Sequence, residues 1–363
     1  MISTKVEPAI LSRSPMDCWP HGVSIAPNNF KHKSLSCWTI NPYVGCSHAC
    51  RFCYVPSVST IKLGPQLAQF GITDPDEQWG EYALLRTWDE GKFLRSLLQA
   101  ERTPIEKLNA DGNRAIMLSS TTDPYQVVRH SDSSRGKELR EQARWMIRRM
   151  LELIRDHSTL NVRILTRSPL AQQDFDLFQS FGNRLLFGMS IPTLNDRLAR
   201  LYEPSAPAPS RRLETLRLAA FNGIPVYVAV APTYPEQGES ELAAVLGEMA
   251  SLNPVTVFHE PINIRAENVG RMKAEAAANG LEFKADVFSS REEWMRYALF
   301  QLRTAQSVAF KLGLGAKFHP WPDLALGSRR LRYEHGPEYS AWIDECWNRI
   351  SAWPRRQQER MAA

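Results

Sequence analysis

Hydrophobic residues recur along this chain in two alternating patterns. Short apolar runs predict buried strands, and longer stretches with apolar residues three and four positions apart predict amphipathic helices. In the helix predicted over 137–157, for example, Leu139, Ala143 and Met146 share one face. The predicted strands are 38–44, 115–118, 162–165, 185–189, 226–230 and 255–258, and the predicted helices are 91–102, 137–157, 171–181, 195–201, 210–222, 240–252, 266–278 and 292–312.

This alternation indicates βα units and a parallel sheet, with about six units in all. We therefore predict an α/β fold in which residues 1–36 are an N-terminal extension and 37–263 form a partial (β/α)6 TIM barrel. Residues 264–363 are then a C-terminal helical region that closes the barrel. Active sites of such barrels lie at the carboxyl ends of the strands, so polar residues directly after each strand are the candidate site residues.

Two stretches are expected to lack regular structure. Residues 57–90 mix glycine, proline and acidic residues and predict a long loop, which is either functional or a plain connector. Residues 313–322, with the sequence GLGAKFHPWP, follow the last predicted helix. They could close the open side of an incomplete barrel and exclude water, or pack as a core loop.

Composition narrows the class of protein. The chain has 363 residues, 43% of them hydrophobic, which is enough for a full core, and 44 Lys and Arg against 39 Asp and Glu give a net charge of +5. So small an excess does not favour a nucleic acid partner, although it allows one. The six cysteines do not look like a secreted disulfide framework. Without a leader pattern or an apolar run of membrane-spanning length, we expect a cytoplasmic protein with no membrane partner.

The densest chemical signal is Cys46, Cys50 and Cys53 at C-x3-C-x2-C spacing. A [4Fe–4S] cluster normally takes four thiolates, one per iron, so three leave one iron without a protein ligand. An open coordination position distinguishes a reactive metal site from a structural one. The alternative is a zinc site in which Cys37, Cys18 or His48 supplies the fourth ligand.

Polar residues follow the predicted strands where barrel chemistry is expected. The cluster after 115–118 suits an amino acid moiety with an ammonium group, although a turn or helix cap uses the same residue types. Arg167 could pair with a carboxylate through two hydrogen bonds. The strand-end candidates are Ser120, Thr122, Asp123 and Tyr125 after the second strand, Arg167 after the third, Ser190 after the fourth, Thr233 after the fifth, and His259 and Glu260 after the sixth. Of these, Tyr125, His259 and Glu260 are the candidates for contact with the substrate.

Five stretches together resemble the spore photoproduct lyase-related branch of the radical SAM superfamily over roughly residues 37–263. They are NPYVGCSHACRFCYV, SSTTDPYQ, LTRSP, SIPTLNDRLARLYEP and GIPVYVAVAP. The resemblance implies that the three cysteines bind a [4Fe–4S] cluster whose open iron chelates S-adenosylmethionine. One electron, from a reductant such as flavodoxin or ferredoxin, then yields a 5′-deoxyadenosyl radical. By the same resemblance Tyr54 lies by the adenine, and Thr122, Arg167 and Ser190 contact the cofactor, with Arg167 in place of an expected lysine.

One position departs from the DNA-repair lyase. That enzyme carries a cysteine that returns a hydrogen atom to the product, and Ser120 stands at the matching position here. An O–H bond is far stronger than an S–H bond, so serine is a poor hydrogen-atom donor. Cys18, Cys37 or Cys346 would have to reach the pocket, or a tyrosine or 5′-deoxyadenosine would return the hydrogen. The sequence therefore favours a radical enzyme with a small-molecule substrate over a DNA-repair lyase or a non-catalytic zinc-binding module.

Overall fold

The computed structural model describes residues 16–28, 30–108, 112–127 and 133–354, so residues 1–15 of the predicted N-terminal extension lie outside it. Its described strands form an open eight-stranded sheet in the order β11-β10-β9-β8-β7-β6-β3-β2, with parallel neighbours from β3 to β11. The predicted α/β architecture with a parallel sheet is confirmed. The strands are β2 (Ala26–Pro27), which is antiparallel to β3, β3 (Trp38–Ile40), β6 (Ala115–Leu118), β7 (Asn161–Thr166), β8 (Leu185–Ser190), β9 (Val226–Thr233), β10 (Val257–Pro261) and β11 (Phe318–Pro320).

Alternation along the strands separates a helix-covered face from an inner face. In β9, Val226, Val228 and Val230 belong to the main hydrophobic core, whereas Tyr227 and Ala229 line an internal cavity. Successive side chains of a strand point to opposite faces, so both faces of this strand are buried and its sequence is apolar throughout. The same alternation decides which polar residues at the strand ends can reach the cavity.

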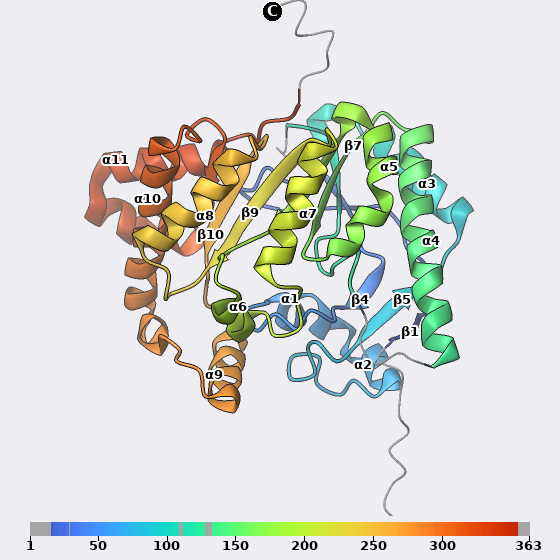
Figure 1. Ribbon diagram of the computed structural model, residues 1–363, viewed down its shortest axis with the longest axis horizontal. Helices are drawn as coiled ribbons and strands as arrows, with labels where there is room; N and C mark the ends of the chain where they lie inside the picture. The colour runs from blue at the N-terminus through green and yellow to red at the C-terminus, as the bar shows by residue number, and fades with distance from the viewer. Residues whose placement is uncertain (1–15, 29, 109–111, 128–132, 355–363) are drawn as a thin grey trace, which may run out of the picture.

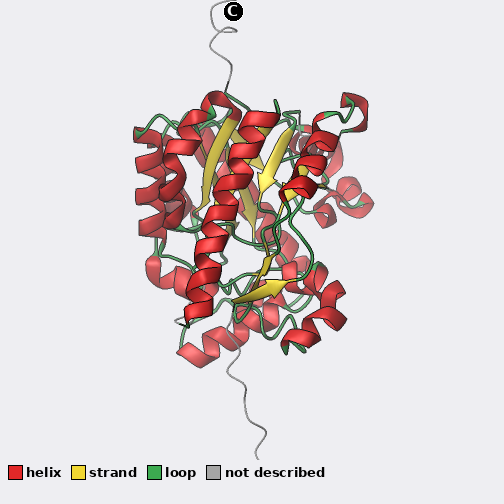
Figure 2. Cartoon of the chain, turned by 90° about the vertical axis from the view of Figure 1, so that its right-hand side faces the viewer, coloured by secondary structure: helices red, strands yellow, loops and turns green. Residues whose placement is uncertain are grey.

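Helices cover the outer face of the sheet, and Figure 1 shows α4, α5, α7 and α8 side by side in that layer. The longest, α4, begins where the Ser133 hydroxyl accepts a hydrogen bond from the Gly136 amide, and it runs down the middle of the face that is turned to the viewer in Figure 2. Its apolar face is buried as predicted. The helices are α3 (Glu90–Glu101), α4 (Ser134–His157), α5 (Phe175–Ser180), α6 (Asp196–Tyr202), α7 (Pro209–Phe221), α8 (Glu239–Ser251), α9 (Asn268–Asn279), α10 (Arg291–Lys311) and α11 (Arg329–Asn348).

A second sheet lies below the large one in Figures 1 and 2 and was not predicted. It contains β1 (Met16–Trp19), β5 (Ala83–Arg86) and β4 (Tyr43–Gly45). The predicted strand 38–44 is therefore wrong as a single element, because the chain leaves the large sheet at Asn41 and Pro42. Proline has no amide hydrogen for a ladder, and the Asn41 side-chain oxygen accepts hydrogen bonds from the amides of Ser120 and Thr121 instead.

The predicted loop 57–90 also contains regular structure. It holds strand β5 and the short helices α1 (Val55–Val58) and α2 (Gly64–Leu67), with 3₁₀ turns at Thr60–Leu63 and Ala68–Phe70. Elsewhere, 3₁₀ turns occur at Ile105–Lys107, Pro169–Asp174, Gly182–Arg184, Ala285–Phe288 and Leu324–Gly327. The predicted helix 171–181 is thus a 3₁₀ turn followed by the short α5. Short elements with irregular apolar spacing leave no periodic signal in the sequence.

The C-terminal part of the chain adds a strand to the large sheet and closes the amino end of that sheet. Residues 318–320, predicted as loop, form β11 and pair in parallel with β10. Helix α11 is kinked at Gly336, which has a φ of 79° and directly precedes Pro337. Further on, Ser351 donates hydrogen bonds from its amide and its hydroxyl to Ser34 and accepts one from the Arg163 guanidinium at 3.0 Å. These contacts close the amino end of the sheet, so its interior opens toward the carboxyl ends of the strands.

No described helix is both long enough and apolar enough to cross a lipid bilayer.

Candidate active site at the carboxyl ends of the strands

A cavity of about 230 Å³ lies inside the curved sheet at the carboxyl ends of its strands. Its walls come from the loop that carries the three cysteines, from the ends of β6 to β10, and from two segments distant in sequence, near Lys33 and at Trp321. Most of the predicted site residues line it: Cys46, Cys50, Cys53, Tyr54, Ser120, Thr122, Asp123, Arg167, Ser190 and Glu260.

Three predicted site residues do not line this cavity. Tyr125 is buried, and its hydroxyl donates a hydrogen bond to Asp174 at 3.0 Å. His259 lies between the cavity-lining residues on either side of it in β10, so its side chain points to the opposite face, where its Nε2 is 3.2 Å from the Thr233 hydroxyl. Burial lowers the pKa of His259 to about 3, so the ring is neutral at physiological pH. This placement does not support the predicted roles of Tyr125 and His259 at the substrate or of Thr233 at the cofactor.

The cysteine loop, residues 46–54, runs from the end of β4 to the start of α1. Cys46 and Cys50 are buried and Cys53 is half-buried. Burial raises the pKa of all three thiols, that of Cys50 to about 12. The thiols are therefore protonated near pH 7, and a metal must displace those protons because the thiolate is the form that binds it.

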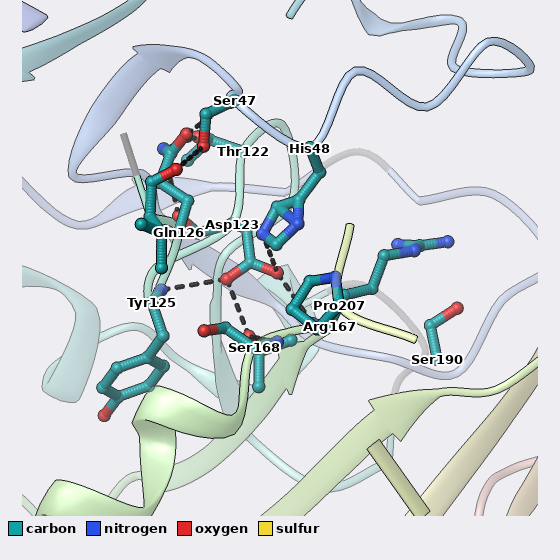
Figure 3. Close-up of polar contacts among 12 residues, drawn as sticks. Ser47, His48, Thr122, Asp123, Tyr125, Gln126, Arg167, Ser168, Ser190 and Pro207 are labelled. Atoms are coloured by element: carbon teal, nitrogen blue, oxygen red, sulfur yellow. Dashed lines mark hydrogen bonds and ion pairs between the residues drawn. The ribbon is translucent and has the colours of Figure 1, made fainter. Parts of the chain in front are cut away.

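The loop after β6 holds the beginning of the cysteine loop (Figure 3). The Thr122 hydroxyl donates to the Gly45 carbonyl at 2.6 Å and accepts from the side-chain amide of Gln126 at 3.0 Å. The Gln126 side-chain oxygen in turn accepts from the Ser47 amide at 2.6 Å, and the Ser47 hydroxyl donates to the Val127 carbonyl at 2.7 Å. Three of these hydrogen bonds thus join two segments that are about 80 residues apart in sequence.

Asp123 sits at the centre of Figure 3, where its carboxylate joins β6 to β7. One oxygen accepts from the Tyr125 amide at 2.9 Å and the Thr166 hydroxyl at 2.7 Å, and the other accepts from the Arg167 amide at 2.8 Å. The Nε2 of His48 lies 3.4 Å from the second oxygen. Burial lowers the pKa of His48 to about 4 despite this carboxylate, so its imidazole is neutral at physiological pH. Asp123 thereby fixes the two strand ends, while the neutral imidazole of His48 lies beside it without a hydrogen bond among the described residues.

A buried carboxylate fixes the side chain of Arg167. Its Nε donates to Glu203 at 2.6 Å, and the other oxygen of Glu203 pairs with Arg212. Arg212 also donates to the Ser190 carbonyl at 3.0 Å, while the Ser190 hydroxyl donates to the Ala231 carbonyl at 2.7 Å. Two guanidinium groups around one fully buried carboxylate satisfy its charge and hold Arg167 against the cavity.

Helix α9 holds the end of the cysteine loop. The Asn268 side-chain amide donates to the Phe52 carbonyl at 3.2 Å, and Arg271 donates to the carbonyls of Arg51 and Cys53. Arg271 is also ion-paired with Asp76, which comes from the segment after α2. The polar side chains of α9 therefore cover the stretch that contains Cys50 and Cys53.

The residues present fit a cluster with one open iron. The three thiols lie on one wall of a single cavity, and that cavity continues past them between the strand ends. Among the described residues, no group of three or more His, Cys, Asp and Glu side chains is arranged to hold a metal ion. A cube places each thiolate on a different iron, so its ligands do not have to converge on one point.

Sequence reasoning missed several residues that shape the site. The sequence marks His48 as a candidate zinc ligand alone, and Gln126 is simply the last residue of the SSTTDPYQ stretch. Asn268 and Arg271 carried no signal, because they lie on a helix beyond the six predicted units. Lys33 lies in a segment without periodicity, and only its position in the fold brings it to the cavity.

The comparisons with known proteins agree with this geometry. A model of the Radical SAM superfamily matches residues 40–249. An uncharacterized protein of Acidianus two-tailed virus is 30% identical over 69% of this chain and 75% of its own length, and one of Methanocaldococcus jannaschii is 26% identical over 63% and 71%. A mutant of spore photoproduct lyase superposes with a TM-score of 0.56 at 13% identity over 88% of this chain and 87% of its own.

A second structure, spore photoproduct lyase complexed with dinucleoside spore photoproduct, superposes with a TM-score of 0.54 over 78% of this chain and 76% of its own, again at 13% identity. At that identity the likeness shows the fold alone. The family-model match, in contrast, spans more than half of the chain and includes the three cysteines. The chain therefore belongs to the radical SAM superfamily, whose members use a [4Fe–4S] cluster and S-adenosylmethionine.

Proposed function

We propose that this protein is an enzyme that cleaves S-adenosylmethionine reductively and directs the resulting radical at a small-molecule substrate. The observation that carries this proposal is the placement of Cys46, Cys50 and Cys53 on one wall of a mostly apolar cavity at the carboxyl ends of the strands. When bound there, the reduced cluster supplies one electron to the sulfonium and so generates the 5′-deoxyadenosyl radical.

The residues around the cysteine loop bind and orient the cofactor in this proposal. Thr122 and Ser190 each use their only hydroxyl proton on a backbone carbonyl, so toward a ligand they act as acceptors, which suits an ammonium group. Arg167 supplies a fixed cation for a carboxylate. We assign Tyr54, Ser120, Thr122, Asp123, Arg167 and Ser190 to the cofactor, with Asp123 acting through the strand ends that it joins.

Enclosure of the cavity serves the same chemistry. The contacts of Ser351 with Ser34 and Arg163 close the amino end, and Trp321 lies against Phe258 at the far wall. A carbon radical must be kept from solvent and from competing reactions, and a cavity closed at one end provides that.

The positions of the other cysteines favour a small-molecule substrate over the repair of DNA. Among the described residues that line the cavity, the cysteines are those of the cysteine loop, while Cys18, Cys37 and Cys346 lie elsewhere. Ser120 occupies the donor position, and its hydroxyl oxygen is engaged by Thr39 at 2.8 Å. A lyase that returns hydrogen from a dedicated thiol does not match this arrangement.

The test is anaerobic reconstitution with iron and sulfide, followed by reduction with dithionite or with flavodoxin or ferredoxin. On addition of S-adenosylmethionine we expect 5′-deoxyadenosine to accumulate. The Cys50→Ala variant should lose both the bound cluster and the product. Cys18→Ala removes a thiol outside the cavity and should keep both.

Two results would overturn the proposal. One is zinc rather than iron–sulfur in protein prepared with both metals available, which would support the zinc-binding module. The other is a reduced cluster that produces no 5′-deoxyadenosine under any reductant.

A further inference from the structure

A second part of the cavity wall is assembled from residues far apart in sequence. We call it the Lys33 side, and it comprises Phe30, Lys33, Tyr227, Phe258, Glu260 and Trp321. Phe258 stacks on Trp321 with ring centroids 4.4 Å apart and meets Tyr227 edge to face at 5.8 Å. The backbone amide of Trp321 donates to the His259 carbonyl at 2.8 Å, which fixes the aromatic wall to β10.

An ion pair stands at the edge of this wall. The Lys33 Nζ is 2.5 Å from the Glu260 carboxylate, and the two side chains keep 26% and 19% of their surfaces exposed. Asn263 lies 3.4 Å from the other oxygen of Glu260. Both charges face the cavity, so a ligand can approach each of them without unfolding any element.

The indole of Trp321 is not available for stacking. Phe258 covers one face, and the Lys33 Nζ lies 4.6 Å from the ring centroid in a cation–π contact. Recognition of unpaired nucleic acid bases relies on open aromatic faces. This wall therefore suits the apolar part of a compact molecule better than a nucleobase.

The cavity-lining residues Tyr227 and Ser119 carry buried hydroxyl groups. Among the described residues, neither the Tyr227 hydroxyl nor the Ser119 hydroxyl has a hydrogen-bond partner, although both side chains are almost completely buried. The Tyr227 ring crosses Gly188 in the neighbouring strand, where the Cβ of any other residue would overlap it. Both residues line the cavity, but the two hydroxyl oxygens themselves have almost no accessible surface, so the ion pair and the aromatic rings are the parts of this wall that a ligand can touch.

The charge of the site selects the class of ligand. A ligand with a single charge would pair with Lys33 or with Glu260 and leave the other partly buried charge without its partner, which is costly. A ligand with one positive and one negative group keeps both paired.

From this geometry we propose that the Lys33 side is the substrate subsite and binds a free α-amino acid. Its ammonium and carboxylate groups would lie at Glu260 and Lys33, and its apolar side chain against the aromatic wall. This inference rests on the proposed function and names its substrate class.

The test measures binding rather than turnover, so its outcome is separate from that of the 5′-deoxyadenosine assay. Cluster-loaded protein is saturated with S-adenosylhomocysteine, which fills the cofactor site, and is titrated calorimetrically with L-leucine, L-phenylalanine and L-tyrosine. We expect at least one to bind. Two analogues of L-phenylalanine, 3-phenylpropionate and phenethylamine, each lack one of its charged groups. We expect each analogue to bind at least about tenfold more weakly than L-phenylalanine does.

Variants locate the binding. Lys33→Met and Glu260→Gln should each weaken amino acid binding roughly tenfold or more, whereas Lys31→Met, an exposed lysine of the same segment, should leave it unchanged. Glu260→Gln keeps the size and hydrogen-bonding capacity of the side chain, so the fold is expected to survive. Absence of binding by all three amino acids, equal affinity in these variants, or binding of thymidine in preference to the amino acids would overturn the proposal.

Discussion

The two sides of the cavity use their polar groups differently. On the cysteine side, Thr122, Asp123 and Glu203 are each committed to two or more partners within the protein. On the Lys33 side, the Lys33–Glu260 ion pair remains partly exposed, and among the described residues the buried Tyr227 hydroxyl has no hydrogen-bond partner. Hydrogen bonds already made within the protein fix geometry in advance, whereas partly exposed charged groups remain able to bind a ligand.

This difference indicates that the two sides of the cavity have different roles. The cysteine side must hold a reactive group in one position, so rigidity is useful there. Its hydrogen bonds join the cysteine loop to the segment after β6 and to α9, and Asp123 joins that segment to β7. The Lys33 side must accept and release a molecule. Substitutions on the first should therefore reduce stability and cluster retention, and substitutions on the second should reduce ligand binding at little cost in stability.

The largest effect is expected for Arg271→Gln. This change removes a guanidinium that donates to the carbonyls of Arg51 and Cys53, and it leaves the buried Asp76 without its cation, with the Ser57 hydroxyl as its remaining side-chain contact. Breaking a buried ion pair from one side should lower the free energy of unfolding by about 3 kcal/mol. Urea denaturation and the iron content after reconstitution measure the two consequences. Lys273→Gln, an exposed position of the same helix, is the matched control, and an unchanged Arg271→Gln protein would show that α9 does not hold the loop.

A smaller loss, of about 2 kcal/mol, is expected for Asp123→Asn. Its two carboxylate oxygens accept from Tyr125 and Thr166 on one side and from Arg167 on the other. An amide has one oxygen, so its NH₂ must face a donor at one of these places. Thermal or urea unfolding tests this, with exposed Asp286→Asn as control. Equal stability of Asp123→Asn and the parent would contradict the central role of this carboxylate.

For Arg167→Lys we expect a change of about 1 kcal/mol in S-adenosylmethionine affinity, or about fivefold. Lysine keeps the charge but lacks the planar fork that lets the side chain bind Glu203 and still present donors to a ligand. Calorimetry on cluster-loaded protein measures the affinity, and Arg200→Lys at an exposed position serves as control. An affinity equal to that of the parent would remove Arg167 from the proposed cofactor contacts.

The smallest effect on stability is expected for Tyr227→Phe, within about 0.5 kcal/mol, because the lost hydroxyl has no protein partner among the described residues. Tyr125→Phe is the matched comparison, since that hydroxyl donates to Asp174, and we expect it to cost about 1 kcal/mol. Urea denaturation of the two variants side by side tests the contrast directly. A larger loss for Tyr227→Phe than for Tyr125→Phe would break the distinction between the two sides of the cavity.

The periodic part of the fold was predictable, and the irregular part was not. Strand 115–118 and helices such as 292–312 were found within one residue at each end, because they are long or bounded by clear breaks. The small sheet was missed because β1, β4 and β5 have three or four residues each. The split at Asn41 and Pro42 depended on hydrogen bonds to a loop almost 80 residues away, which no local pattern encodes.

The site residues show the same contrast between local patterns, which are predictable, and tertiary contacts, which are not. Cys46, Cys50 and Cys53 are marked by their spacing, and Glu260 by its place just after a strand. His259 is the adjacent residue and was also predicted, yet alternation along β10 turns it away from the cavity. A strand end brings two neighbouring residues to the same edge, and only the pleat and register decide which of them faces inward.

By itself, the sequence determined the α/β class, the three-cysteine motif and the edge of the sheet where chemistry is placed, because periodicity and spacing are local properties. Only the tertiary structure decided which segments complete the cavity. Lys33, Glu260 and Trp321 are separated by up to 288 residues, yet they are in contact. Arg271 likewise reaches the cysteine loop across about 220 residues. Such contacts arise from chain topology, since burial brings distant segments together without leaving a signal at either one.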